Sequence, residues 1–144
     1  MDAARITGIG SAFPARRLTN EDLARRLAAD GIETSDRWIR ERSGIRVRRI
    51  SDLGSNEAET NSSLGARAAL RALEMAGRRA DELDQILYAT CTPDTLLPST
   101  ACWLQKKIGA ENAWAVDINA ACSGFVYGVV MAQQFIRSGH AQTV

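Results

Sequence analysis

The stretch Asp117-Ile118-Asn119-Ala120-Ala121-Cys122-Ser123-Gly124-Phe125 places a cysteine where an apolar strand is expected to end and an apolar helix to begin. At a helix N-terminus, unpaired backbone N–H groups and the helix dipole favour a thiolate and can hold a developing oxyanion. Small residues surround the thiol and leave room for a sharp turn and a substrate, as in a nucleophile elbow. The sequence therefore predicts Cys122 as a nucleophile, with a buried structural thiol as the alternative.

In the rest of the chain, the hydrophobic pattern and the capping residues predict alternating strands and helices. A length of 144 residues suffices for one domain with a core. The alternation predicts an α/β fold. The expected strands cover residues 6–9, 45–50, 86–89 and 114–118, and a loop is expected at 51–60. The expected helices run from the Thr19/Asp22 capping box to Gly31, from Thr34-Ser35-Asp36 to Gly44, over 62–76, from Pro98-Ser99 to Gly109 and over 123–138.

The helix expected at 123–138 is apolar on almost every face, whereas one sheet can cover only one of them. A further layer must therefore cover the rest. We expect residues 1–144 to be the first half of a larger protein, whose second α/β layer packs over the Cys122 helix.

Composition and charge exclude several classes of protein. The formal net charge of +1 gives no basic field for binding nucleic acid. The three cysteines have no C-x-x-C spacing, so neither a disulfide framework nor a metal site is expected. No apolar segment reaches the ~20 residues of a membrane span, and the N-terminus lacks a secretory signal. A soluble, cytoplasmic protein that does not bind membranes is expected.

Three ordered motifs resemble the β-ketoacyl-acyl-carrier-protein synthase III family of condensing enzymes. They are Thr34-Ser35-Asp36-Arg37-Trp38-Ile39 with Arg42-Ser43-Gly44-Ile45-Arg46, then Pro98-Ser99-Thr100-Ala101-Cys102, and finally residues 117–125. The resemblance runs from Ile6 to the end of the chain. It implies a thiolase-like layered αβαβα fold, of which this chain is the N-terminal half, and a homodimer.

The resemblance also implies a mechanism. The cysteine matching Cys122 takes an acyl group from acyl-CoA and passes it to a carbanion made by decarboxylating malonyl-acyl-carrier protein, which gives a 3-oxoacyl-acyl-carrier protein. CoA is then a substrate, and no cofactor is expected. The family's catalytic His and Asn lie beyond Val144. His140 matches no catalytic position, and we interpret it as an exposed residue near a helix end.

The resemblance implies that Thr34, Trp38, Arg42 and Ser43 bind CoA. An exposed indole can stack on adenine while guanidinium groups pair with phosphates. A basic cluster surrounds Trp38, consisting of Arg40, Arg42, Arg46, Arg48 and Arg49. From the residues alone, Trp38 is better explained as a core or rim residue and the arginines as a solvated face, and only the resemblance favours CoA binding.

Two further positions bear on the substrate. Leu97 matches a position where many family members carry Phe, at a dimer interface beside the acyl pocket. A smaller side chain there would admit primers longer than acetyl, although an ordinary core or interface leucine is the alternative. Cys91 matches the catalytic Glu of the hydroxymethylglutaryl-CoA synthases, which disfavours that branch. We expect Cys91 and Cys102 to be buried and inert.

Three alternatives to the condensing enzyme stay open. A family relative could transfer the acyl group from Cys122 to an oxygen or nitrogen nucleophile without decarboxylation, and the downstream His and Asn would separate the two. A non-catalytic CoA-binding or assembly subunit belongs to a second class. A thiol redox sensor is disfavoured, because Cys122 has no resolving cysteine near it in the sequence.

Overall fold

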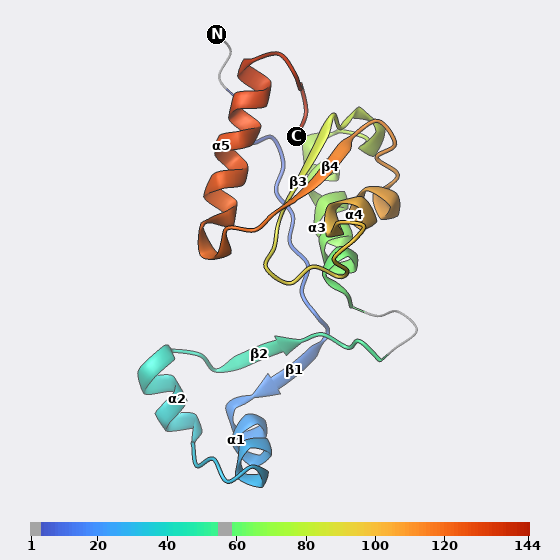
Figure 1. The fold of residues 1–144 in the computed structure, drawn as a ribbon. Helices are drawn as coiled ribbons and strands as arrows, with labels where there is room; N and C mark the ends of the chain where they lie inside the picture. Colours follow the sequence, from blue (N-terminus) through green and yellow to red (C-terminus); the bar gives the residue numbers. More distant parts are fainter. Residues whose placement is uncertain (1–3, 55–58) are drawn as a thin grey trace. The chain divides into compact units, whose positions relative to one another are not determined.

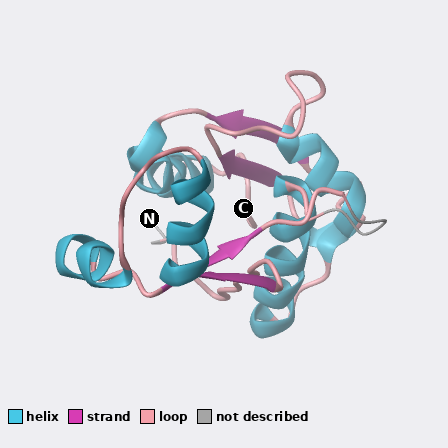
Figure 2. Cartoon of the chain, turned by 90° about the horizontal axis from the view of Figure 1, so that it is seen from below, coloured by secondary structure: helices cyan, strands magenta, loops and turns pink. Residues whose placement is uncertain are grey.

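The computed structural model describes residues 4–54 and 59–144. The chain divides into two compact units. The small unit comprises residues 13–59, and the large unit comprises residues 1–12 together with 60–144. Residues 55–58 of the expected loop at 51–60 lie outside the described residues. Figure 2 shows that the strands form two separate pairs, one in each unit.

The small unit consists of an antiparallel pair of strands with two helices between them in sequence. Strand β1 (Arg16–Thr19) pairs with β2 (Val47–Ile50), with Arg16 opposite Ile50 and Thr19 opposite Val47. Helices α1 (Asn20–Ala29) and α2 (Asp36–Ser43) connect them. The predicted strand at 45–50 is therefore confirmed over most of its length, whereas β1 was not predicted.

Both helices of the small unit begin at the predicted caps. The Asp22 N–H donates to the Thr19 hydroxyl at 3.1 Å, and the Thr19 N–H donates to the Asp22 carboxylate at 3.3 Å. The Ser35 hydroxyl accepts from the Trp38 N–H at 3.1 Å, and α2 ends at Gly44, whose φ is 72°. Side-chain caps and a left-handed glycine satisfy groups that a helix end leaves unpaired.

The large unit is built on a parallel pair of strands. Strand β3 (Gln85–Ala89) pairs with β4 (Trp114–Ile118). Helix α5 (Gly124–Arg137) lies on one side of this pair, and α3 (Asn61–Ala76) and α4 (Thr100–Ile108) lie on the other (Figure 1). Two short 3-10 helices, η1 (Ala80–Glu82) and η2 (Ala121–Ser123), complete the unit. The predicted α/β class and these strands and long helices are confirmed.

The core of the large unit lies between the strand pair and helices α3 and α4. Burial of apolar surface at about 25 cal/mol per Å² is the main force that holds such layers together. The buried hydrophobic residues of this core are Ala66, Leu83, Ile86, Ala101, Leu104, Ile108, Ala110 and Ala113.

The prediction of a buried strand at 6–9 is wrong. Residues 4–13 form no strand, and Ile6 and Ile9 are exposed. The segment instead lies against α3 through its glycines: a Cβ atom added at Gly8 would overlap the carbonyl oxygen of Ala72, and one at Gly10 that of Ala68. Absence of a side chain lets the two backbones approach closely, so glycine here serves helix contact and not strand pairing.

Helix α5 is not buried on all sides within this chain. Phe125 is 72% exposed and Val126 58%, and the only buried residue of the helix is Gly124. The strand pair covers one face and leaves an apolar surface larger than scattered single residues would give. In the described part of the chain, no helix is both long enough and apolar enough to cross a membrane.

Candidate functional site

Cys122 lies on a tight turn between the end of β4 and the start of α5. The thiol is exposed, and the residue is the middle one of η2. Ala121, immediately before it, has a φ of 45°, the left-handed region that costs an L-residue roughly 1–2 kcal/mol. The turn therefore holds a sparsely populated backbone conformation next to the thiol, which is common at functional sites.

The turn is packed tightly against the neighbouring strand. Gly124 is buried, and a Cβ atom added there would lie 3.0 Å from the Cβ atom of Ala89 at the end of β3. The Ser123 side chain makes no capping hydrogen bond to α5. The first turn of α5 therefore begins close to the sheet without a side-chain cap, and the Gly124 N–H donates to the Ala121 carbonyl.

Asp117 anchors the end of β4 to helix α4. Its carboxylate accepts from the backbone N–H of Thr100 at 2.8 Å and from that of Ala101 at 2.7 Å. These N–H groups belong to the first turn of α4, where an anion is also stabilised by the helix dipole. The strand that leads to Cys122 is therefore fixed five residues before the thiol.

A second polar network fixes the loop that follows β3. The Tyr88 hydroxyl donates to the backbone oxygen and the side-chain oxygen of Asn61, both at 2.8 Å. The Asn61 amide donates in turn to Thr90 and Thr92, also at 2.8 Å. Burial, with the charges of Asp94 and Asp117, raises the pKa of Tyr88 to about 12. Tyr88 is thus a neutral donor at physiological pH.

The expectation that Cys91 is buried is wrong. Cys91 is exposed, because β3 ends at Ala89 and the loop leaves the sheet. Cys91 and Cys122 thus both follow the carboxyl ends of paired parallel strands. Cys102 is half-buried, and the Ser99 hydroxyl lies 3.1 Å from its sulfur.

Leu97 lies on the loop before α4 and is 83% exposed, and its peptide bond to Pro98 is cis. The alternative of a core leucine is therefore excluded within this chain. The neighbouring Leu96 is 87% exposed, so the loop presents an apolar surface.

In the small unit, the predicted CoA-binding residues gather on α2. The Arg42 guanidinium lies over the Trp38 ring, 4.4 Å from the ring centroid, and Trp38 is 52% exposed. A guanidinium on one face orders the indole and leaves the remaining surface accessible. The core interpretation of Trp38 is therefore wrong, and the pair is suited to a planar aromatic ring and a phosphate.

The other two predicted CoA contacts lie before α2 and at its last residue. The Thr34 side chain is half-buried before the helix, and its hydroxyl has no hydrogen-bond partner among the described residues. The Ser43 hydroxyl donates to the Ile39 carbonyl at 2.7 Å and accepts from the Ile45 N–H at 3.2 Å. Ser43 therefore also closes the end of α2.

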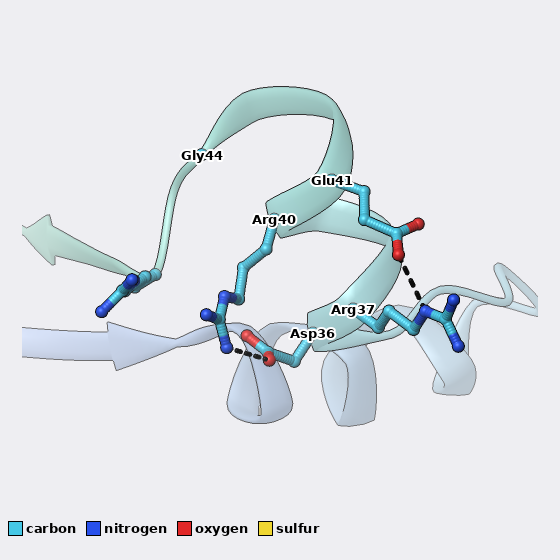
Figure 3. A pocket seen from close by; sticks show the side chains of 6 residues that line it. Asp36, Arg37, Arg40, Glu41 and Gly44 are labelled. Carbon is cyan, nitrogen blue, oxygen red and sulfur yellow. Dashed lines mark hydrogen bonds and ion pairs between the residues drawn. The ribbon is translucent and has the colours of Figure 1, made fainter.

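The predicted basic cluster does not act as one group. Arg48 donates to the Asn20 side chain at 2.8 Å, and Arg49 donates to the Ala15 carbonyl at 3.0 Å, so both stabilise the small unit. Arg40 pairs with Asp36 at 3.3 Å (Figure 3).

A hollow of about 450 Å³ lies along α2, beside this ion pair. Figure 3 shows that Arg40 points toward Asp36 and Arg37 toward Glu41, so charges of both signs face each other here. The residues that line the hollow are Asp36, Arg37, Arg40, Glu41, Gly44 and Arg46. Trp38 and Arg42 are not among them, so the hollow and the stacked pair are separate features. No group of metal-ligating side chains occurs among the residues that the structure describes.

Three features of the site were not predicted from the sequence. The left-handed Ala121 had no signal beyond the run of small residues, and the cis bond at Pro98 had only the proline itself. The role of Asp117 could have been suspected, because an acidic residue stands within an otherwise apolar strand.

The sequence matches one family of known proteins. Residues 116–144 match the family model of 3-oxoacyl-[acyl-carrier-protein (ACP)] synthase III. Over 141 residues, 98% of the chain, the sequence is 50% identical to the β-ketoacyl-[acyl-carrier-protein] synthase III of Xylella fastidiosa. The match covers 41% of that relative, so the chain spans about two fifths of its length.

Solved structures agree with this match. The 3-oxoacyl-[acyl-carrier-protein] synthase III of Aquifex aeolicus superposes with a TM-score of 0.85 at 42% identity, over 96% of this chain and 42% of its own. The priming β-ketosynthase of the R1128 polyketide pathway superposes with a TM-score of 0.85 at 33% identity, over 96% and 39%. On these grounds the chain belongs to the β-ketoacyl-acyl-carrier-protein synthase III family and has the α/β, thiolase-like fold of these condensing enzymes.

Proposed function

We propose that the protein catalyses an acyl-CoA-primed, decarboxylating condensation with malonyl-acyl-carrier protein, in fatty-acid or polyketide synthesis. The observation that carries this proposal is the exposed Cys122 on its strained turn at the start of α5. A nucleophile on such a turn projects from the backbone while N–H groups of the helix start lie close to the reacting carbonyl. The name of the Xylella relative fits the same reaction.

In the first half-reaction, the Cys122 thiolate attacks the carbonyl carbon of acyl-CoA. The negative charge develops on the carbonyl oxygen, where the N–H of Cys122 supplies one oxyanion donor. One such donor stabilises a transition state by about 3 kcal/mol. The bond between that carbon and the CoA sulfur then breaks, CoA leaves as a thiolate and takes up a proton, and the acyl group stays on Cys122.

In the second half-reaction, the malonyl group loses CO₂, and the electron pair of the broken C–C bond forms a carbanion. The carbanion attacks the acyl carbonyl, and the Cys122 sulfur leaves with its electron pair. The product is a 3-oxoacyl-acyl-carrier protein. A thioester exchange followed by a carbon–carbon bond formation replaces one difficult step, which is the advantage of covalent catalysis.

The small unit supplies the proposed CoA site. Trp38 would stack on the adenine, and Arg42 would pair with a phosphate, since a guanidinium forms bidentate bonds to phosphate oxygens. Thr34 and Ser43 are proposed as further contacts at the two ends of α2. CoA is a substrate here, so the proposal includes no cofactor.

We further propose that residues 1–144 form the N-terminal half of the enzyme. This proposal is supported by coverage of 41% of the Xylella relative and by the exposed apolar face of α5, which a second α/β layer would cover. The missing half would contribute the His and Asn that stabilise the carbanion. The enzyme would act as a homodimer, with Leu97 at the dimer interface beside the acyl pocket of the partner.

The test is a condensation assay with the full-length protein, short acyl-CoAs and malonyl-acyl-carrier protein. The proposal predicts that CO₂ and 3-oxoacyl-acyl-carrier protein form in equal amounts. Acyl transfer to an alcohol or amine without CO₂ release would instead support the non-decarboxylating alternative. Absence of both acyl transfer and CO₂ release, with CoA still bound, would support a binding or assembly subunit.

A further inference from the structure

Helix α2 is held at both of its ends by one side chain from another helix. Asn20, the first residue of α1, is fully buried. Its amide donates to the Asp36 carboxylate at 2.8 Å and to the Ile45 carbonyl at 2.7 Å. Asp36 is the first residue of α2, and Ile45 follows the glycine that ends it. Both hydrogens of one amide group therefore bind opposite ends of the same helix.

The side-chain oxygen of Asn20 also has a hydrogen-bond partner. It accepts from the Arg48 guanidinium of β2 at 2.8 Å. A buried polar group that keeps all its hydrogen bonds specifies one arrangement, whereas losing a partner leaves a costly unpaired group. Asn20 thus connects α1, both ends of α2 and β2, all of which belong to the small unit.

We propose that Asn20 is a positioning residue for CoA, which fixes α2 so that Trp38 and Arg42 present one stacked surface. The inference rests on the proposed function, because it takes the stacked pair as the CoA site. Trp38 and Arg42 lie one turn apart on this eight-residue helix. So short a helix is marginal in isolation and depends on tertiary contacts for its order.

The chemistry of Asp36 supports this role. The hydrogen bond from Asn20 is the largest influence that lowers the Asp36 pKa, followed by Arg40, with Arg46 adding a smaller contribution and desolvation opposing them. The carboxylate is therefore held ionised beside the amide, and an ionised acceptor makes the stronger hydrogen bond. Figure 3 shows Asp36 at the base of the helix, with Arg40 directed toward it.

The test uses the full-length protein with Asn20→Asp, which keeps the shape of the side chain but replaces both N–H donors by an oxygen. CoA itself is the ligand, and its Kd is measured by calorimetry. We expect the Kd to rise roughly tenfold, since apparent affinity falls with the fraction of molecules whose helix is in the competent position. Trp38→Ala, measured alongside, reports whether CoA binds at α2 at all.

A spectroscopic readout separates positioning from general destabilisation. In a background with Trp103→Phe and Trp114→Phe, Trp38 is the remaining indole of residues 1–144. The emission lost when Trp38→Phe is added to this background is that of Trp38, and it reports the contact with Arg42. Asn20→Asp should shift this emission and raise its quenching by acrylamide in the absence of CoA. Asp36→Asn added to Asn20→Asp restores a donor and acceptor pair, and it should recover part of the CoA affinity.

Gln105→Glu is the matched control. The Gln105 amide also donates to two backbone carbonyls, those of Ala110 and Ala113, but in the large unit. The control makes the same chemical change and should leave the CoA Kd and the Trp38 emission unchanged. Asn20→Ser, which retains one donor, is measured if Asn20→Asp does not fold. It should give a smaller rise in the CoA Kd and a smaller shift of the Trp38 emission.

The outcomes distinguish the inference from the function on which it rests. Unchanged CoA affinity and Trp38 emission in a folded Asn20 variant overturn the positioning role, while the CoA site stands if Trp38→Ala still weakens binding. If Trp38→Ala leaves the CoA Kd unchanged, the proposed site fails, and with it the role of Asn20 toward CoA. A shift of Trp38 emission in Asn20→Asp would then show only that the amide orders the helix.

Discussion

Gly124 at the start of α5 and Ala89 at the end of β3 approach so closely that a Cβ atom at position 124 would lie 3.0 Å from that of Ala89. This separation is shorter than ordinary van der Waals contact, so the neighbouring strand would have to move. The contact fixes the start of the helix two residues after Cys122. The site therefore depends on the absence of a side chain at Gly124.

Substitution of Gly124 by Ala should lower the free energy of unfolding by about 1–3 kcal/mol, because the added methyl group overpacks the contact with Ala89. Gly128→Ala is the control in the same helix, where the added Cβ atom would lie 4.0 Å from Ile118. That variant should gain about 0.5–1 kcal/mol from helix propensity. Denaturant unfolding of both measures the contrast, and equal effects would disprove the close contact.

Substitution by glycine should destabilise the protein less at Ala121 than at other alanines. At its φ of 45°, Ala121→Gly removes a steric cost of roughly 1–2 kcal/mol, which offsets the greater flexibility of the unfolded chain. Its free energy of unfolding should thus stay the same or rise. Ala132→Gly in the interior of α5 should instead lose about 1 kcal/mol. A similar loss in both variants would show that Ala121 carries no strain.

Replacement of Asp117 by Ala should lower the free energy of unfolding by about 2 kcal/mol or more, since two N–H groups of α4 lose a charged acceptor. Asp117→Asn should be intermediate, because its amide keeps one acceptor oxygen. Asp30→Ala, at the exposed end of α1, is the surface control and should change stability little. Stability of Asp117→Ala equal to that of Asp30→Ala would show that Asp117 does not anchor the strand.

The protein should lose stability between pH 10 and about 12 through Tyr88. The Tyr88 pKa is raised from 10.0 to about 12 in the folded state, so the unfolded chain releases this proton first. The stabilisation is complete below the unfolded pKa and is lost as pH rises through the folded value. Unfolding free energies measured across this range should fall, and Tyr88→Phe should remove that part of the fall. Tyr127→Phe, the control at an exposed tyrosine, should show the same fall in unfolding free energy as the wild-type protein.

Local signals in the sequence predicted most of the elements and the place of Cys122 between a strand and a helix, because caps and glycines act over a few residues. In the small unit, these local signals are the Thr19/Asp22 capping box, Ser35 and Gly44. The errors involve contacts between distant residues. Gly8 and Gly10 lie against α3 and not in a sheet, and Cys91 leaves the core because β3 ends two residues earlier.

The arrangement of side chains in the site was predicted less well. The arginines at 40–49 were interpreted as a solvated face or, through the resemblance, as groups that pair with phosphates, whereas Arg40 and Arg48 are used by Asp36 and Asn20. The pairing of Arg48 with Asn20 depends on which residues the fold brings together and leaves no periodic trace in the sequence, whereas Asp36 and Arg40 are four residues apart on α2. The stacking of Arg42 on Trp38 follows from their spacing of four on a helix, a neighbour relation that the sequence does contain.

The central claim is that Cys122 forms a thioester, and mass measurement of the full-length protein after mixing with a series of short acyl-CoAs tests it most directly. We predict a mass increase equal to one acyl group, mapped by peptide analysis to Cys122 and absent in a folded Cys122→Ala variant. Cys91→Ala, at the other exposed thiol, should retain it. Acylation that persists in Cys122→Ala, or a wild-type protein that gains no acyl group, would contradict the claim.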